Sequence, residues 1–377
     1  MKISYITLYD ELNIHKWSGS GYYIAKTLIE QNAELDFIGT KNVKVDALSK
    51  LKTYYYRAIN KKYNFKRSVA YTKRFAEICK MSLKENTDII FSPGSIALSE
   101  LETNIPKVFY TDATFQGLID FYETYTNLSK EMIQQGHYLE TKALESCALA
   151  IYSSDWAAKS AIDYYHIAPE KVKVVPFGAN IESNRNLDDI KAIVSSRPRK
   201  ECTLLFIGVD WERKGGDLAV KVAGELNRQG LKTKLHVVGI RNLDESNLPG
   251  FVINHGFISK ANEEGREKID KLLAESHFLI VPSKAEAFGI VFCEASSFGL
   301  PSLSTNVGGI TSVIRDDVNG KTFSSDKDEK AYAQFILDKF HHFSDYESLA
   351  YSSFHEFEDH LNWKVSGAKI MNHLKAL

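Results

Sequence analysis

The sequence predicts an α/β protein made of two Rossmann-like domains, each built on a parallel sheet. Its 377 residues exceed what one ordinary core contains, and 44% hydrophobic with 25% charged residues is typical of a globular protein. Short apolar runs alternate with longer amphipathic patterns, as they do where helices join parallel strands. The alternation forms two consecutive series, which indicates two domains with a cleft between them.

The first series contains six strand-like runs and four helical patterns. We expect strands at 2–8, 35–38, 88–91, 107–111, 150–152 and 172–176. We expect helices at 21–30, 68–84, 131–146 and 155–165. Ser154 precedes the last of these helices, where its hydroxyl can accept a hydrogen bond from an unpaired amide. The first domain is expected over residues 1–182.

The second series follows a polar stretch at 181–201, which contains Pro198 and is interpreted as a linker. We expect strands at 203–207, 234–238, 251–254, 278–282 and 301–304. We expect helices at 216–229, 260–276 and 290–298. The second domain is expected over residues 200–359.

The densest chemical signal lies between residues 284 and 310, directly after a strand-like run. Glu286 stands in the predicted loop, and Glu294 stands on the helix that follows. Ligands of such folds bind at the carboxyl ends of the strands, where loops lead into helices. Glu286 is therefore a candidate for holding sugar hydroxyls, and Glu294 for accepting hydrogen bonds from a ribose diol.

The start of that helix suits a phosphate group. Gly289, Ile290 and Val291 would present amides without intrahelical partners at the positive end of the helix dipole. An isolated pair of glutamates would be interpreted as solvated side chains on an amphipathic helix. The preceding strand and the Gly308–Gly309 turn, which lets backbone approach a ligand closely, favour a binding site instead.

A second cluster follows the first strand of the second domain. Arg213 and Lys214 stand in a loop just before a glycine-rich helix start. Two cations at the carboxyl end of a strand can hold a diphosphate without a metal ion. An ordinary basic surface loop is the alternative.

A third candidate is the loop after the first strand, which contains Gly19 and Gly21. Amides near these glycines would face a diphosphate from the other domain. A dinucleotide-binding fingerprint is the competing interpretation. The third glycine of that fingerprint is missing, and the loop is longer than a dinucleotide turn.

These motifs resemble the E-x7-E signature of the retaining glycosyltransferases of family 4, or "group 1", which have the GT-B architecture of two Rossmann-like domains. The segment 284–310 and the Arg213–Gly215 element carry the resemblance most specifically. The stretch Pro176–Asn180 and Glu140 also fit the family pattern, while the first domain as a whole matches more loosely.

The resemblance implies a role for each matching residue. Glu286, with Phe288, Gly289 and Ile290 beside it, would hold the donor sugar, and Glu294 would bind the ribose of the nucleotide. Arg213 and Lys214 would stabilise the charge that grows on the leaving diphosphate. The candidate catalytic residues are therefore Arg213, Lys214 and Glu286.

The implied reaction moves a hexose-type sugar from a nucleoside diphosphate to an acceptor hydroxyl with retention of anomeric configuration. Polysaccharide, glycolipid or glycoconjugate synthesis would use such an enzyme. The family needs no essential metal, and the sequence has no D-x-D motif or histidine cluster near the candidate site. We therefore expect a nucleotide-sugar co-substrate, a carbohydrate or glycolipid acceptor, and no cofactor.

Asp112 departs from the pattern, because many family members have a histidine that faces the donor sugar at this point. Asp112 would hold a sugar hydroxyl or position the acceptor, or it would cap the next helix. The resemblance also implies that a last helix from Asn362 crosses back to the first domain, adding residues 360–377 to the acceptor-binding domain.

The remaining composition bears on location and partners. No apolar run is long enough to span a membrane, and four scattered cysteines fit a reducing cytoplasm. Residues 50–84 hold eleven Lys or Arg against the single acid Glu77, with aromatic residues interleaved. This segment is either a solvated face or a surface for an anionic lipid headgroup or phosphorylated acceptor. Nucleic acid is not expected, because no nucleic-acid-binding module accompanies the bases.

Two other functions stay open. A sugar-nucleotide epimerase shares the scaffold, but it needs a general acid and base flanking the sugar, and no such pair stands out. A non-catalytic nucleotide-sugar-binding subunit would not need the intact cluster of Arg213, Lys214, Glu286 and Glu294. The sequence identifies neither the base and sugar of the donor nor the acceptor.

Overall fold

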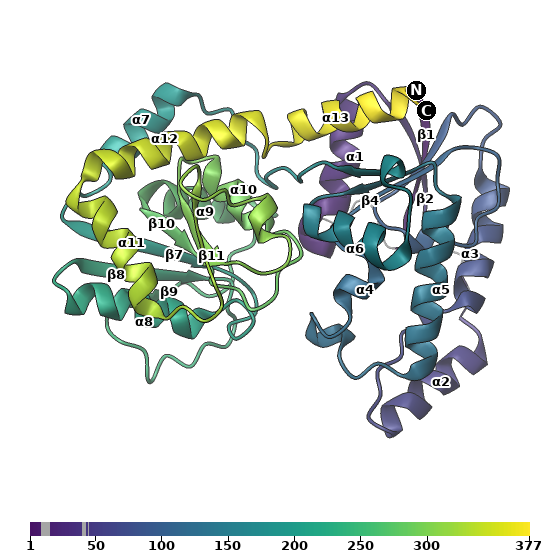
Figure 1. Cartoon of the computed structure of the whole chain (residues 1–377), viewed down its shortest axis with the longest axis horizontal. Coiled ribbons are helices and arrows are strands. Elements are labelled where there is room, and N and C mark those ends of the chain that lie inside the picture. The colour runs from purple at the N-terminus through teal and green to yellow at the C-terminus, as the bar shows by residue number, and fades with distance from the viewer. Residues whose placement is uncertain (9–15, 40–42, 44) are drawn as a thin grey trace. The chain divides into compact units, whose positions relative to one another are not determined.

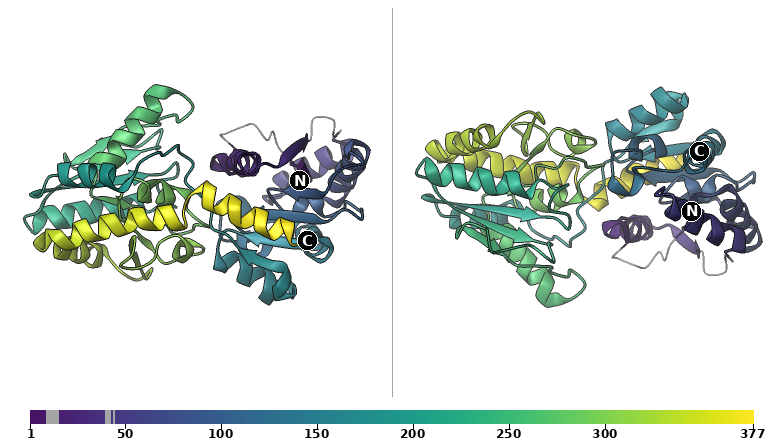
Figure 2. Two further views of the ribbon diagram at one scale, coloured as in Figure 1. Left: turned by 90° about the horizontal axis from the view of Figure 1, so that it is seen from above. Right: turned by 90° about the horizontal axis from the view of Figure 1, so that it is seen from below.

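The computed structural model describes residues 1–8, 16–39, 43 and 45–377, and it divides the chain into two compact units. The N-terminal unit contains Met1–Pro176 and Ser366–Leu377, and the C-terminal unit contains Phe177–Val365. Each unit has a six-stranded parallel sheet with helices on both faces (Figure 1; Figure 2). The predicted fold class of two parallel α/β domains is therefore confirmed.

The sheet of the N-terminal unit has the order β2-β1-β3-β4-β5-β6. Its strands are β1 (Lys2–Ile6), β2 (Glu34–Ile38), β3 (Ile89–Ser92), β4 (Lys107–Thr111), β5 (Leu149–Tyr152) and β6 (Val172–Val174). Its helices are α1 (Ser20–Glu30), α2 (Ala47–Ala58), α3 (Val69–Ser82), α4 (Phe115–Leu118), α5 (Lys130–Ser146) and α6 (Asp155–Tyr165). All six expected strands form, and most of their apolar side chains are buried because helices cover the sheet. Phe37 of β2 and Val174 of β6, on the two edge strands, are each 37% exposed.

The strand order reverses at β1, which pairs with β2 on one side and with β3 on the other. Helix α1 therefore packs on one face of the sheet, while α3, α5 and α6 lie on the other (Figure 1). The carboxyl ends of β1 and β3 diverge at this point, which is where open α/β sheets bind ligands.

The sheet of the C-terminal unit has the order β12-β11-β10-β7-β8-β9. Its strands are β7 (Glu201–Ile207), β8 (Lys232–Val238), β9 (Val252–Asn254), β10 (Phe278–Ile280), β11 (Ser302–Thr305) and β12 (Gly320–Phe323). Its helices are α7 (Leu187–Ser196), α8 (Gly216–Arg228), α9 (Glu263–Glu275), α10 (Ile290–Ser296), α11 (Glu329–His341) and α12 (Phe343–Asp359). Helices α8 and α11 pack together on one face, and α7 packs against α9 and α12 on the other (Figure 1).

The predicted linker at 181–201 is wrong, because this stretch lies within the C-terminal unit and its middle, Leu187–Ser196, forms α7. Asn186 and Asp189 form a capping box at its start, in which each side chain binds the other residue's amide. Ile190 and Val194, one helical turn apart, are buried. The polar residues around them, Asp188, Lys191, Ser195 and Ser196, are exposed, which made the segment look like a linker.

The end of α7 is fixed by the buried side chain of Arg197. Its guanidinium donates hydrogen bonds to the carbonyls of Ala274, Phe298 and Gly299 and to the Tyr346 hydroxyl, at 2.7 to 3.0 Å. These acceptors lie at or near the ends of α9 and α10 and on α12. One buried cation therefore ties four helices together, with each of its three nitrogens donating to at least one neutral oxygen.

The last helix, α13 (Trp363–Lys375), belongs mainly to the N-terminal unit, as the sequence predicts. The Asn362 side chain accepts a hydrogen bond from the Val365 amide at 2.9 Å and so caps the helix. The Ser366 hydroxyl donates to the Pro176 carbonyl at 2.7 Å, and Gly367 lies against Thr27 of α1. A side chain at position 367 would collide with Thr27, so this close approach requires glycine.

Candidate functional site

The candidate donor site begins where two neighbouring strands end. β7 and β10 pair in parallel, with Leu205 opposite Leu279, so their carboxyl ends lie side by side. The loop after β7 carries Arg213 and Lys214, and the loop after β10 carries Glu286. A hydrogen bond from the Lys284 amide to the Arg213 carbonyl, 2.7 Å long, joins the two loops.

The three charged side chains form one cluster. The Lys214 ammonium donates to the Glu286 carboxylate, and both residues are buried. The Arg213 guanidinium lies 3.8 Å from the same carboxylate oxygen and donates to the Ala285 carbonyl at 2.9 Å. Asp210 accepts from both the amide and the side chain of Arg213. The cluster therefore has two cations fixed beside one buried carboxylate.

Gly215 allows the loop after β7 to pack directly against the backbone that follows β10. Its φ is +75°, in the left-handed region, and a Cβ there would lie 2.1 Å from the Pro282 carbonyl oxygen. On the other side of the cluster, the Gly309 amide donates to the Glu286 carbonyl at 3.0 Å. The Gly308–Gly309 turn thus supports the Glu286 loop from β11.

Glu294 is almost completely buried on α10, and its carboxylate pairs with Lys260 at 2.5 Å. Lys260 lies in the loop between β9 and α9 and is itself partly exposed. Sequence reasoning missed Lys260, because it assigned this residue only to a helical pattern. A ribose diol would have to bind Glu294 beside this ammonium or in its place.

Helix α10 begins at Ile290, with the left-handed Gly289 as its N-cap and no side-chain cap. The amides of Ile290 and Val291 lie in its first turn, where helix geometry provides no intrahelical partner. Phe288 is buried, and its ring meets that of Phe177 edge-on at 5.3 Å between centroids. Phe288 therefore anchors the loop through its buried ring.

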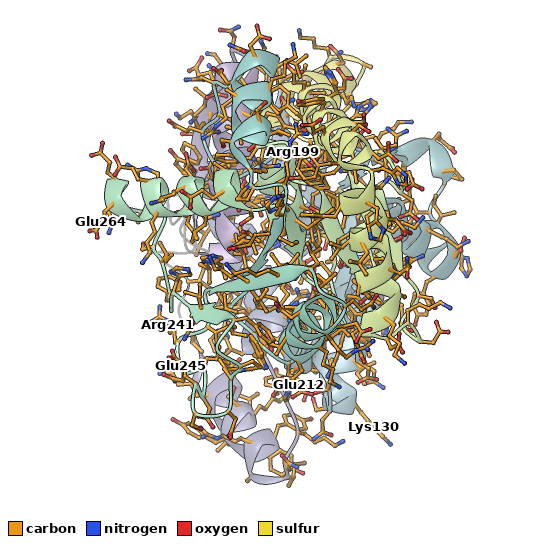
Figure 3. All side chains as sticks on the ribbon, turned by 90° about the vertical axis from the view of Figure 1, so that its left-hand side faces the viewer. Lys130, Arg199, Glu212, Arg241, Glu245 and Glu264 are labelled. Carbon is orange, nitrogen blue, oxygen red and sulfur yellow. The ribbon has the colours of Figure 1, made fainter. Side chains whose placement is uncertain are left out.

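The loops after β8 and β9 are connected by a ring contact. Arg241 lies over Phe257, with its guanidinium carbon 4.3 Å from the ring centroid. His236 and His255 stack at 5.1 Å, and burial lowers the pKa of His236 to about 4, with His255 and Lys234 adding to the shift. Figure 3 shows Arg241 and Glu245, both in the loop after β8, near each other at one edge of the unit.

In the N-terminal unit, the loop after β1 meets the loop after β4. The Trp17 indole donates to the Asp112 carboxylate at 3.0 Å. Gly19 is the left-handed N-cap of α1, and Gly21 lies in the first turn of that helix. Asp112 does not cap the next helix, because the Thr114 hydroxyl accepts from the Gly117 amide at the start of α4. Asp112 is thus held by a loop contact rather than used as a cap.

A cavity of about 490 Å³ lies beside this contact, at the carboxyl ends of β1, β3 and β4. Trp17, Asp112 and Glu140 are among its lining residues. Glu140 is 1% exposed, and Ser95 donates to one of its carboxylate oxygens at 2.7 Å. Burial raises the pKa of Glu140 to about 7, against the opposing effects of the Ser95 hydrogen bond and the Arg67 charge. Sequence reasoning noted Glu140 only as part of the architecture.

The structure thus places the predicted residues in two groups. Arg213, Lys214 and Glu286 form one cluster in the C-terminal unit, with Glu294 on the adjoining helix. Gly19 and Asp112 belong to the N-terminal unit. Within the described ranges, no three His, Cys, Asp or Glu residues gather as metal ligands, and no helix is long and apolar enough to cross a membrane.

The raised pKa of Glu140 leads to a prediction about stability. The folded protein holds this proton more tightly than the unfolded chain, so Glu140 contributes stability below its ordinary pKa of 4.5 and loses it as the pH rises through about 7. Between pH 4.5 and 8 the free energy of unfolding of the wild type should fall by roughly 3 kcal/mol relative to Glu140→Gln. Urea unfolding of both proteins across this range measures it. A difference that does not change with pH contradicts the assignment.

The profile of the family described as "Glycosyl transferases group 1" matches residues 188–346. The D-inositol 3-phosphate glycosyltransferase of Acidothermus cellulolyticus is 27% identical over 183 residues, covering 45% of this chain and 41% of that protein. The phosphatidylinositol N-acetylglucosaminyltransferase gpi3 subunit of Schizosaccharomyces pombe is 24% identical over 242 residues, covering 62% and 49%. The matches thus span about half or less of these curated relatives.

Two solved structures are similar over nearly their full lengths. The sucrose-phosphate synthase of Thermosynechococcus elongatus has a TM-score of 0.69 at 15% identity, covering 100% of this chain and 98% of that one. The Anabaena protein HepE, in complex with UDP, has a TM-score of 0.68 at 16% identity, covering 100% of both chains. At such low identity the similarity establishes the fold alone. Residues 188–346 of the C-terminal unit therefore match the group 1 glycosyl transferase family, and the whole chain has the GT-B fold of two Rossmann-like domains.

Proposed function

We propose that the protein transfers a hexose-type sugar from a nucleoside diphosphate to an acceptor hydroxyl, with retention of anomeric configuration. The C-terminal unit would bind the donor, and the N-terminal unit would bind a carbohydrate or glycolipid acceptor. The observation that carries the proposal is the cluster of Arg213 and Lys214 around Glu286 at the adjoining ends of β7 and β10. This cluster lies within the segment that matches the group 1 family.

Sugar transfer needs positive charge near the leaving diphosphate, and Arg213 and Lys214 provide it in this cluster. As the glycosidic bond breaks, negative charge grows on the diphosphate and the sugar becomes an oxocarbenium-like cation. Arg213 and Lys214 would stabilise the leaving diphosphate, joined by the first-turn amides of Ile290 and Val291. Glu286 would hold hydroxyls of the donor sugar, and Glu294 would hold the ribose. No metal ion is required in this scheme.

The names of the relatives support the proposed acceptor class. The Acidothermus protein is named for transfer to D-inositol 3-phosphate, and the Schizosaccharomyces subunit for transfer to phosphatidylinositol. Both acceptors carry hydroxyls on a six-membered ring. We infer a polyhydroxylated acceptor for this chain as well, used in polysaccharide, glycolipid or glycoconjugate synthesis in the cytoplasm.

Substitutions in the proposed donor site should impair transfer while the protein stays folded. Arg213→Gln should lower kcat by about 10²–10³-fold, because one lost donor to the developing charge costs this much in other enzymes. Glu286→Gln should lose transfer to a similar extent, and Glu294→Gln should mainly raise KM for the donor. Sugar transfer from the nucleotide sugar that most raises the melting temperature of the wild type measures these effects.

Lys232→Gln is the matched control, because Lys232 is an exposed cation at the opposite, amino end of β8. It removes one positive charge from the same unit and should leave kcat and KM unchanged. Normal transfer by Arg213→Gln and Glu286→Gln would show that the site lies elsewhere. Nucleotide-sugar binding without transfer to any acceptor would indicate a non-catalytic binding subunit.

We also propose that α2 contacts an anionic membrane surface on the cytoplasmic face. Leu48, Leu51 and Tyr55 recur at helical spacing and are exposed, and Leu51 has 64% of its surface in contact with solvent. Tyr54 beside them is 70% exposed, and Arg57 stands in the last turn. An exposed apolar stripe flanked by bases suits the interface of an anionic bilayer.

The full chain should then sediment with phosphatidylcholine vesicles that contain phosphatidylglycerol, and much less with phosphatidylcholine alone. The variant Leu51→Ser/Tyr55→Ser should bind the anionic vesicles at least about tenfold more weakly, because burying each apolar side chain contributes 1.5–3 kcal/mol. Ile29→Ser, which alters an exposed apolar residue on α1, serves as the control. Equal binding by the double variant and the control would contradict the membrane contact.

A further inference from the structure

The cavity in the N-terminal unit has the size and position of a small-molecule site. Its volume of about 490 Å³ falls within the range of roughly 300–1,000 Å³ that ligand pockets occupy. It lies where the strand order reverses, at the carboxyl ends of β1 and β3. Described residues from the loops after β1, β3 and β4 line it, together with η2 (Phe65–Arg67) and α5.

Arg67 is a cation of this cavity that forms no ion pair with a described residue, although its charge opposes the rise in the pKa of the buried Glu140. The structure contains no hydrogen bond or ion pair of its guanidinium with any described residue. The guanidinium carbon lies 5.2 Å from the Tyr125 ring centroid and 5.7 Å from that of Phe115. These contacts orient the side chain through its face and leave its edge, with the N–H donors, available to a ligand.

Two packed elements hold Arg67 in place: the Phe115 ring beside its side chain and the turn η2 that carries its backbone. Phe115 is buried against Gly136 of α5, where a Cβ would lie 2.1 Å from the ring. The Asn64 side chain accepts from the Lys66 amide, and the Asn64 carbonyl accepts from the Arg67 amide, so η2 has one defined turn. Lys66, which is exposed, also lines the cavity. Two neighbouring cations are therefore presented to the same space.

Glu140 supplies a second, independent sign of a ligand. Its side chain is buried at the cavity wall, and its Oε1 has no hydrogen-bond partner among the described residues. It forms no ion pair with Arg67, although both residues line the same cavity. A buried carboxyl oxygen without a partner is costly, and a hydroxyl of a bound ligand would satisfy it. Aromatic rings with a carboxyl group are the usual partners of a sugar's C–H faces and hydroxyls.

We propose that this cavity binds the acceptor as a polyhydroxylated ring that carries an anionic group. Arg67 and Lys66 hold the phosphate or carboxylate of that ring, and Glu140 holds one of its hydroxyls. The proposal rests on the proposed transferase function and names the class of its acceptor. The same chemistry occurs in a free sugar phosphate and in a lipid-linked one, and the experiment distinguishes these sources.

Calorimetric titration of the full chain with three probes tests the proposal: glucose 6-phosphate, its octyl ester and uncharged methyl glucoside. The wild type should bind glucose 6-phosphate at least about tenfold more tightly than methyl glucoside. Arg67→Gln should weaken glucose 6-phosphate binding about ten- to a hundredfold and abolish that preference. Arg67→Lys should recover only part of it, because an ammonium keeps the charge but lacks the planar fork.

Two further variants separate this site from general effects. Lys80→Gln removes an exposed cation of α3 outside the cavity, and it should leave all three affinities unchanged. Glu140→Gln should weaken both sugars while keeping the preference for the charged one. Tighter binding of the octyl ester than of glucose 6-phosphate identifies a lipid-linked acceptor, and equal or weaker binding identifies a free one.

Two results overturn the proposal: equal affinity of the wild type for charged and uncharged probes, or equal losses in Arg67→Gln and Lys80→Gln. Titration of the same samples with UDP and GDP distinguishes this failure from failure of the transferase function. Nucleotide binding that Arg67→Gln leaves intact, without a preference for the charged sugar, refutes the anionic acceptor alone. Absence of nucleotide binding in the wild type refutes the transferase.

Discussion

The proposed donor site depends on a buried ion pair between Lys214 and Glu286. Removing Glu286 would leave the buried Lys214 ammonium without a carboxylate partner, a change that typically costs about 3–5 kcal/mol, whereas removing Lys214 leaves Arg213 beside the carboxylate. The pair therefore holds together two loops that are 72 residues apart in the sequence, at the adjoining ends of β7 and β10. Gly215 and the Lys284–Arg213 backbone hydrogen bond bring those loops into contact. A donor that binds here enters a set of charges already fixed in place, so little reorganisation is needed at the moment of reaction.

The charged residues of the two candidate sites differ in whether they form ion pairs. In the C-terminal unit, the cations of the cluster have a carboxylate beside them, and Glu294 has Lys260, so an incoming nucleotide sugar would exchange one set of ionic contacts for another. In the N-terminal unit, Arg67 lies on aromatic rings and Glu140 is buried nearby without forming an ion pair with it. Exchangeable ionic contacts in the C-terminal unit suit a diphosphate that must be released after transfer. A cation without an ion pair in the N-terminal unit suits an acceptor whose anionic group takes no part in the chemistry.

Much of the fold was predictable, because strands buried on both faces appear in the sequence as short apolar runs between amphipathic patterns. Segments whose stability depends on contacts distant in sequence could not be predicted in this way. Helix α7 buries only Ile190 and Val194, and Arg197 connects it to helices far along the chain. Strand β12, Gly320–Phe323, is too short and mixed to show a pattern. For the site, Arg213, Lys214 and Glu286 stand in recognisable motifs, whereas Lys260 and Arg67 acquire their partners only through tertiary packing.

The central claim is that Lys214 and Glu286 act as one unit in the transfer of the donor sugar. A double-mutant cycle on kcat/KM, with Lys214→Met, Glu286→Gln and the combined variant, tests it most directly. We predict that each single change costs at least about a hundredfold and that the double variant is close to the worse single one, a coupling of about 2 kcal/mol or more. Losses that multiply in the double variant, or single variants with wild-type activity, would contradict the account.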